Sequence, residues 1–356
     1  MRPRCAGAGR RTILSYGPVA GYGPLREWIA ERHGVDPGRV LVTNGSLQGF
    51  VFFAQRFRGG RVLVEAPTYD RPLKILAGLG AEAVALPIDD DGLDPDVLAA
   101  ELDRGPKPAF LYTIPTFQNP SGRTLSPERR RRVVELDRER DLLVLEDDPY
   151  GLVRYEGEAL PTLFELDGGE RIAYSSSFSK TIAPGIRVGY LVLPAELEAD
   201  LEAIAVSTYI TPVLLGQASV HEFLSRGYLE PNLERVRRLL GARRDAMLAA
   251  LDRELGADAA WSRPEGGYFI WLDLPRGVSA AELLPQAAAA GVTFVPGSDF
   301  YLRGEGGGGS ARLAFSFVSL DEIDEGVSRL AELLGDDAAS DRAARGASLP
   351  AGRSRG

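Results

Sequence analysis

One lysine lies in a short segment whose neighbours could support covalent chemistry. Lys180 follows Ser177 and Ser179, and Arg187 comes later in the same segment. A lysine amine attacks a carbonyl carbon only when it is unprotonated, so its pKa must be lowered by burial or by a nearby cation such as Arg187. Two serine hydroxyls and a guanidinium also suit a phosphate ester. A reactive lysine beside a phosphate site predicts pyridoxal phosphate, held as a Schiff base on Lys180.

A carboxylate follows another apolar run. Asp147 belongs to the segment 146–150, which follows a predicted buried strand at residues 142–145, and residues 171–176 predict the strand that leads to Lys180. Ligands of α/β proteins gather at such strand ends. Asp147 could pair with the pyridine nitrogen and keep it protonated, which makes the ring an electron sink. The alternative is a helix-capping aspartate, a role that Asp148 before Pro149 fits better.

Four more residues occupy similar positions. Ser46 opens a helical run whose first amides could face a phosphate. Tyr69 could stack on a cofactor ring, and Asn119, in a loop flanked by prolines, could donate to a phenolic oxygen or a carboxylate. Arg312 lies in an apolar, strand-like run and needs an anion, which is either a structural carboxylate or the α-carboxylate of a substrate.

The elements that must position these residues follow a βα alternation. Apolar runs at residues 40–43, 61–65, 82–86, 109–114, 142–146, 172–175 and 188–193 are separated by helical stretches. This pattern predicts an α/β fold whose large domain has a mainly parallel, seven-stranded sheet between helices. Long helical stretches and a hairpin-like segment then predict a smaller α+β C-terminal domain. We expect the large domain over residues 14–210 and the small one over 211–335.

Composition limits the partners and the location. The 356 residues carry a net charge of -9, which gives no overall attraction to nucleic acid or to an anionic membrane. One cysteine and two histidines argue against disulfides and transition metals, so we expect a cytoplasmic protein without a metal or a membrane span. The arginine run at 129–132 predicts a solvated amphipathic helix. Residues 336–356 are poor in apolar side chains and predict a disordered tail.

Together these residues resemble the fold-type I pyridoxal-phosphate aminotransferases, in particular the subgroup of 2-aminoadipate and kynurenine/aminoadipate aminotransferases. The resemblance covers residues 14–334, and residues 1–13 do not match. It depends on sequence blocks that occur in the same order, at residues 15–18, 21–26, 43–48, 65–69, 115–122, 146–150, 177–189, 264–271 and 295–297.

The resemblance implies transfer of an amino group from an L-amino acid to a 2-oxo acid, with 2-oxoglutarate as the expected acceptor. Lys180 would form the internal aldimine and move the proton between Cα and C4′. Asp147 would hold the pyridinium, and Arg312, helped by Asn119, would bind the substrate α-carboxylate. For the cofactor, the resemblance also implies stacking by Tyr69 and hydrogen bonds from Asn119 and Tyr150 to O3′. It implies a homodimer whose active sites lie at the subunit interface. The phosphate would then be bound by Ser46, the Leu47 amide, Ser177, Ser179, Arg187 and the partner subunit's Tyr16.

Two departures from the family pattern affect these expectations. Leu47 stands where the family usually has Gln, and only Met1 to Ile13 precede the block around Tyr16, where relatives carry a longer segment that covers the site. We therefore expect either a reading frame that starts upstream or an altered, open substrate site. Three alternatives remain: elimination or decarboxylation with the same cofactor, a non-catalytic effector domain of a GntR-type regulator, and cofactor binding without turnover. Aromatic, branched-chain and dicarboxylic substrates all stay open.

Overall fold

The computed structural model describes the backbone of residues 13–347 and the side chains of residues 13–335. Within this range the large sheet has eight strands in the order β1-β8-β7-β6-β5-β2-β3-β4. Seven are the expected strands, and the two-residue β4 is an addition at the edge. The strands are β1 (Val40–Thr43), β2 (Arg61–Ala66), β3 (Glu82–Asp89), β4 (Gly92–Leu93), β5 (Phe110–Thr113), β6 (Val144–Asp147), β7 (Ala173–Ser177) and β8 (Gly189–Val192).

Six strands of this sheet point the same way, and the loops after five of them carry candidate site residues. Strands β3, β2, β5, β6 and β7 pair in parallel. Strand β8 is antiparallel to both β7 and β1, so β1 points the same way as β7. The carboxyl ends of β1, β2, β5, β6 and β7 therefore lie together, and the loops that follow them can form one site.

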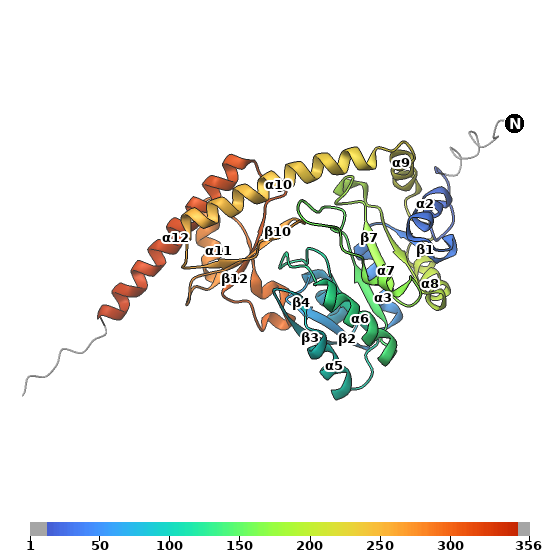
Figure 1. Cartoon of the computed structure of the whole chain (residues 1–356), viewed down its shortest axis with the longest axis horizontal. Coiled ribbons are helices and arrows are strands. Elements are labelled where there is room, and N and C mark those ends of the chain that lie inside the picture. The colour runs from blue at the N-terminus through green and yellow to red at the C-terminus, as the bar shows by residue number, and fades with distance from the viewer. Residues whose placement is uncertain (1–12, 348–356) are drawn as a thin grey trace, which may run out of the picture.

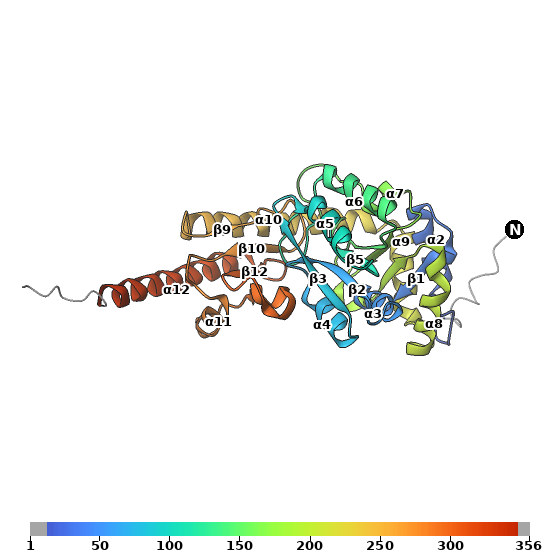
Figure 2. The ribbon, with the colours of Figure 1, turned by 90° about the horizontal axis from the view of Figure 1, so that it is seen from below.

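Apolar side chains cover both faces of this sheet, because neighbouring strand residues point to opposite sides. Leu63 packs into one cluster, whereas Val62 and Val64 pack into the other. Figure 2 shows the helices on the two sides of the sheet. One face is covered by α2 (Gly23–His33), α5 (Pro95–Arg104), α6 (Pro127–Arg140) and α7 (Leu163–Asp167), and the other by α3 (Ser46–Arg56), α4 (Asp70–Gly78) and α8 (Glu198–Tyr209).

The small domain is built on a second, antiparallel sheet. Its strands, in spatial order, are β11 (Val295–Pro296), β12 (Ser310–Ala314), β10 (Phe269–Asp273) and β9 (Ala260–Trp261). Helices α10 (Leu229–Glu254), α11 (Ala280–Ala289) and α12 (Leu320–Ala347) complete it, and α10 runs from the large domain into the small one (Figure 1). None of the helices in the described part of the chain is long and apolar enough to cross a membrane.

Two expectations about boundaries need correction. Helix α9 (Leu214–Ser225) lies beyond residue 211, yet its Val220 and Leu224 pack into a core cluster of the large domain. Helix α12 continues to Ala347, so residues 336–347 are helical where composition predicted disorder. Alanine-rich sequence favours helix through local propensity, which a test of apolar content does not detect. The rest of the predicted tail and residues 1–12 lie outside the described residues.

The arginine run in α6 is only partly solvated. Arg130 is fully buried, because it precedes Val133 and Val134 by one helical turn and shares their apolar face. Its guanidinium donates to the main-chain oxygens of Leu125, Pro115 and Pro161 and to the hydroxyl of Thr116, at 2.7 to 3.0 Å. Arg130 thus ties α6 to the loop that follows β5.

We expect Arg130→Met to lower the free energy of unfolding by about 3 kcal/mol or more, because it leaves buried carbonyl oxygens without donors. Unfolding in urea, followed by circular dichroism, measures this change. Arg131→Met is the matched control in the same helix, since the Arg131 side chain is 58% exposed. Equal stability of the two variants would contradict the role assigned to Arg130.

Candidate active site

A cavity of about 350 Å³ lies where the five strand ends meet. Its volume falls in the range of small-molecule sites, about 300–1,000 Å³. Phe269 and Arg312 of the small domain form part of its wall. Every site residue predicted from the sequence, except Tyr16, lines it: Ser46, Leu47, Tyr69, Asn119, Asp147, Tyr150, Ser177, Ser179, Lys180, Arg187 and Arg312.

One end of the cavity is suited to an anion. Helix α3 begins at Ser46, and no side chain among the described residues caps its N-terminus, so its first amide N–H groups are available to a phosphate. Arg187 donates to the Ser179 hydroxyl at 3.3 Å and to the main-chain oxygen of Asn44 at 3.3 Å. The Ser177 and Ser179 hydroxyl oxygens are 2.9 Å apart. These groups place positive charge and donors around one point.

Gly45 allows this arrangement to form. Its φ of 99° lies in the region that favours glycine, and a Cβ at this position would collide with the guanidinium of Arg187. The turn between β1 and α3 therefore needs a residue without a side chain. Close approach of the turn and Arg187 is the reason.

Asp147 has one carboxylate oxygen without a partner. Oδ2 accepts a hydrogen bond from the Tyr112 hydroxyl at 2.8 Å, whereas Oδ1 is buried and has no hydrogen-bond partner among the described residues. Burial raises the pKa of Asp147 to about 6, against the hydrogen bonds that lower it. A buried carboxylate oxygen is costly to leave unpaired. A protonated pyridine nitrogen would satisfy it, so this end of the cavity fits the expected cofactor ring.

Lys180 follows β7 as expected, and its environment favours the neutral amine. Burial is the largest cause that lowers its pKa, followed by the positive charges of Arg312 and then Arg187. The sequence named burial or a cation such as Arg187 as the possible cause; the structure has both and adds Arg312 as a second cation. The amine lies 5.1 Å from the ring centre of Tyr268, whose hydroxyl donates to the Lys180 main-chain oxygen at 2.8 Å.

Arg312 is a cation without an anion. Its guanidinium carbon lies 4.2 Å from the ring centre of Phe269 and 4.9 Å from that of Phe300. It donates to the Asn119 side-chain oxygen at 2.9 Å, and its buried Nε has no partner among the residues that the structure describes. No ion pair joins it to a carboxylate in the described part of the chain, which argues against the structural salt bridge left open by the sequence. A ligand carboxylate fits this position.

A buried carboxylate that the sequence did not single out supports two of the loops. Glu65 accepts hydrogen bonds from the Thr113 hydroxyl at 2.5 Å, the Ile114 amide at 3.2 Å and the Gln118 side chain at 3.0 Å. Gln118 also donates to the main-chain oxygen of Pro67 at 2.6 Å. The loop that carries Asn119 is thereby joined to the loop that carries Tyr69. Only the position of Glu65 at a strand end hinted at this role.

Other residues of the site were also missed. Asp70 and Arg71 line the cavity directly after Tyr69. Their place beside a predicted ligand contact was the available signal. Tyr112 bonds to the Asp147 carboxylate and Tyr268 to the main chain at Lys180, each from a distant segment of the chain, so no spacing rule indicated them.

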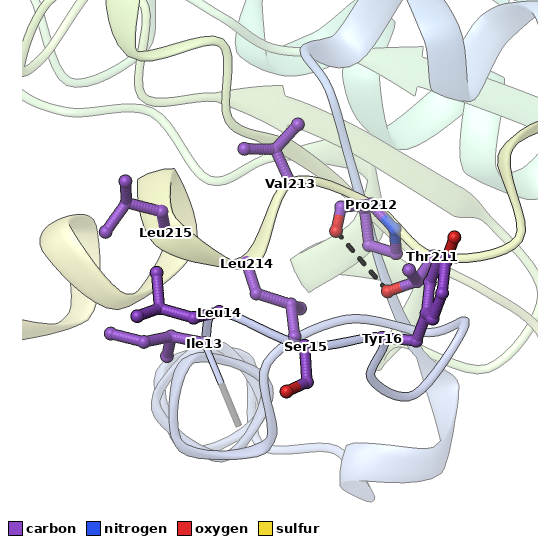
Figure 3. A pocket seen from close by; sticks show the side chains of 9 residues that line it. All are labelled: Ile13, Leu14, Ser15, Tyr16, Thr211, Pro212, Val213, Leu214 and Leu215. Carbon is purple, nitrogen blue, oxygen red and sulfur yellow. Dashed lines mark hydrogen bonds between the residues drawn. The ribbon is translucent and has the colours of Figure 1, made fainter. Parts of the chain in front are cut away.

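Tyr16 does not line the cavity. Its side chain is 81% exposed and borders a separate, more open hollow with Thr211 (Figure 3). One chain alone does not bring Tyr16 to the phosphate end. Its expected role from the partner subunit stays a prediction.

Known proteins share this fold. Residues 6–330 match the family described as aminotransferase class I and II. The chain belongs to this family. The match begins at residue 6, so it includes part of the segment 1–13 that we expected not to match. This aminotransferase is 41% identical over 328 residues to the 2-aminoadipate transaminase of Thermus thermophilus, with 90% of this chain and 81% of the relative covered.

Two further relatives agree with the family. Aromatic-amino-acid aminotransferase 1 of Thermococcus litoralis is 35% identical over 336 residues, which cover 91% of this chain and 80% of the relative. The crystal structure of the α-aminoadipate aminotransferase LysN from Thermus thermophilus, complexed with N-(5'-phosphopyridoxyl)-L-leucine, has a TM-score of 0.89 and 38% identity, covering 93% of this chain and 86% of that one. The expected fold, enzyme class and pyridoxal-phosphate cofactor are confirmed.

The raised pKa of Asp147 predicts a pH-dependent stability in the cofactor-free protein. A carboxyl whose pKa is higher in the folded state stabilises the fold below its unfolded pKa of 3.8, and this contribution is lost as the pH rises through about 6. At 1.36 kcal/mol per unit, we expect wild type to lose about 2 kcal/mol relative to Asp147→Asn between pH 4 and pH 7, because the unfolded carboxyl is already partly ionised at pH 4.

Unfolding in urea at a series of pH values measures the difference between wild type and Asp147→Asn. Asp90→Asn, at a side chain that is 95% exposed, is the control and should show no such trend. A difference that stays constant across this pH range would contradict the prediction.

Proposed function

We propose that this aminotransferase carries its cofactor on Lys180 and transfers the amino group of an L-amino acid to a 2-oxo acid, with 2-oxoglutarate as an acceptor. The observation that supports this proposal is that one cavity holds three suitable groups. Lys180 has a lowered pKa, and Asp147 and Arg312 each have a buried polar atom without a hydrogen-bond partner among the described residues. Pyridoxal phosphate supplies an aldehyde and a protonated ring that withdraws electrons from the substrate Cα.

Lysine content supports the assignment of Lys180. The chain has three lysines, and the other two are Lys74 and Lys107. Their side chains are 63% and 60% exposed, and each forms an ion pair with an aspartate. Of the three, Lys180 is the one that lines the cavity. A buried amine with a lowered pKa is the one suited to attack an aldehyde.

The proposed roles of the other residues follow from their partners. Asp147 Oδ1 would accept from the ring nitrogen, and Tyr69 would lie against the ring. Arg312 uses the Asn119 oxygen, which leaves the Asn119 amide nitrogen to donate to the phenolic oxygen or to the substrate. The phosphate would be held by Ser46, the Leu47 amide, Ser177, Ser179 and Arg187, and the phenolic oxygen also by Tyr150.

Lys180 would then act on the substrate proton. Arg312 binds the α-carboxylate and so fixes the substrate Cα relative to the lysine amine. The neutral amine takes the proton from Cα and later returns a proton to complete the transfer. Burial and two nearby guanidinium groups keep this amine from holding its proton too strongly.

We propose that the protein is a homodimer. A cytoplasmic location is proposed because a single cysteine forms no intramolecular disulfide, which fits a reducing compartment. Large apolar side chains are exposed around the hollow in Figure 3, where Ile13 and Leu14 lie near Leu214 and Leu215. The exposed fraction is 78% for Leu14 and 62% for Val213. Contiguous exposed apolar surface of this kind marks protein interfaces. A second copy that covers it would bring a partner's Tyr16 to the cavity.

Lys180→Ala should lower the rate of amino transfer by roughly 10³-fold, since the general acid and base is removed. Borohydride reduction of the wild-type holoenzyme, followed by peptide mass mapping, should place the pyridoxyl group on Lys180. Lys74→Ala is the control and should keep full activity. Labelling at Lys74 or Lys107 instead, or no glutamate formed from a panel of amino acids with 2-oxoglutarate, would overturn the proposal.

Sedimentation velocity tests the assembly. Wild type should have twice the mass of one chain, whereas Val213→Asp with Leu215→Asp should be monomeric, because both charges enter the apolar surface around the hollow. The monomer should also bind pyridoxal phosphate more weakly. Phe317→Asp changes a side chain that is 96% exposed on the small domain and serves as the control. A dimeric double variant would place the interface elsewhere.

A further inference from the structure

Two charged residues in the cavity have no part in holding the cofactor. Asp70 and Arg71 begin α4, directly after Tyr69, and both line the same cavity as Lys180 and Arg312. The Asp147, Arg187 and Lys180 side chains are accounted for by the ring nitrogen, the phosphate and the aldehyde. Arg312 is accounted for by the substrate α-carboxylate. Asp70 and Arg71 therefore remain available to the rest of the substrate.

These two residues form a pair that can open at low cost. Arg71 Nη1 lies 3.1 Å from Asp70 Oδ2, and the Arg71 side chain is 56% exposed. The same Asp70 oxygen is 2.8 Å from the Lys74 amine, one helical turn away. Exposed ion pairs contribute only about 0–1 kcal/mol. Asp70 keeps a cationic partner when Arg71 turns toward another anion.

Arg71 also lies within electrostatic reach of Arg312. Burial is the largest cause that lowers the pKa of Arg312; the charge of Arg71 adds to this effect, and Asp70 opposes it. Burial also raises the pKa of the Tyr69 hydroxyl, and both guanidinium groups oppose that shift. Besides Arg187 at the phosphate end, the cavity presents two guanidinium groups, Arg312 from the small domain and Arg71 from the large domain. A ligand with two carboxylates separated by a short chain matches this pattern of charge.

We propose that Arg71 recognises the side-chain carboxylate of dicarboxylic substrates, while Arg312 binds their α-carboxylate. The inference depends on the proposed function, because it assigns the α-carboxylate to Arg312. Substrates with uncharged side chains leave Arg71 paired with Asp70. The site then accepts both classes, and Arg71 adds affinity for the dicarboxylic class alone.

Steady-state kinetics of Arg71→Gln test the proposal. With a fixed amino donor, the KM for 2-oxoglutarate should rise at least tenfold, whereas the KM for 2-oxopentanoate, of equal chain length with one carboxylate, should change less than twofold. Lys107→Gln is the control, because Lys107 is 60% exposed, pairs with Asp141 and does not line the cavity, and it should leave both constants unchanged. Equal effects of Arg71→Gln on the two acids, or none on either, would overturn the proposal.

A binding measurement separates this inference from the proposed function. Glutarate and valerate have the same chain length and cannot accept an amino group, so calorimetry on the holoenzyme reports recognition alone. Wild type should bind glutarate at least tenfold more tightly than valerate, and Arg71→Gln should remove that preference. Absence of any amino transfer would refute the proposed function. A glutarate preference that survives in Arg71→Gln would refute the role of Arg71.

Discussion

This site depends on two buried, charged side chains that each keep one polar atom without a hydrogen-bond partner among the described residues. Asp147 Oδ1 and Arg312 Nε are both held away from water, and no group in the described part of the chain satisfies them. Such burial is unfavourable, so the surrounding fold must hold these groups in place. A cationic ring nitrogen at Asp147 and a substrate carboxylate at Arg312 would each remove part of that cost. The affinity of the cavity for its ligands originates in this incomplete pairing.

The rigidity required for this comes from polar groups behind the site. Glu65 joins the loops after β2 and β5, and Arg130 joins the loop after β5 to α6. Glu146, adjacent to Asp147, faces away from the cavity and accepts hydrogen bonds from the first amides of α7 at 3.0 and 2.8 Å. These loops are thus fixed by buried charged side chains that are themselves hydrogen-bonded.

Contacts between the two domains complete the site. Arg312 in β12 donates to Asn119, and Tyr268 donates to the main chain at Lys180. The position of Arg312, the proposed carboxylate-binding group, therefore depends on how the small sheet packs against the large domain. Arg71 and Arg312 belong to different domains. The packing of the two domains, and not either sheet alone, therefore sets the distance between the two guanidinium groups that would bind the substrate carboxylates.

The sequence by itself determined the parallel sheet, the cofactor and most of the cavity. Apolar runs with polar residues at their ends identify strand ends, and the ends of parallel strands meet at one edge, so the order of residues alone brings Lys180, Asp147 and Asn119 together. Tertiary structure decided what one-dimensional spacing does not encode. Four features depend on contacts between segments that are distant in sequence. They are the burial of Arg130 and Glu65, the missing partner of Arg312 within the described residues, the packing of α9 on the large domain and the presence of Arg71 in the cavity. Those contacts set the local desolvation, and desolvation is what turns these charged side chains into supports or ligand sites.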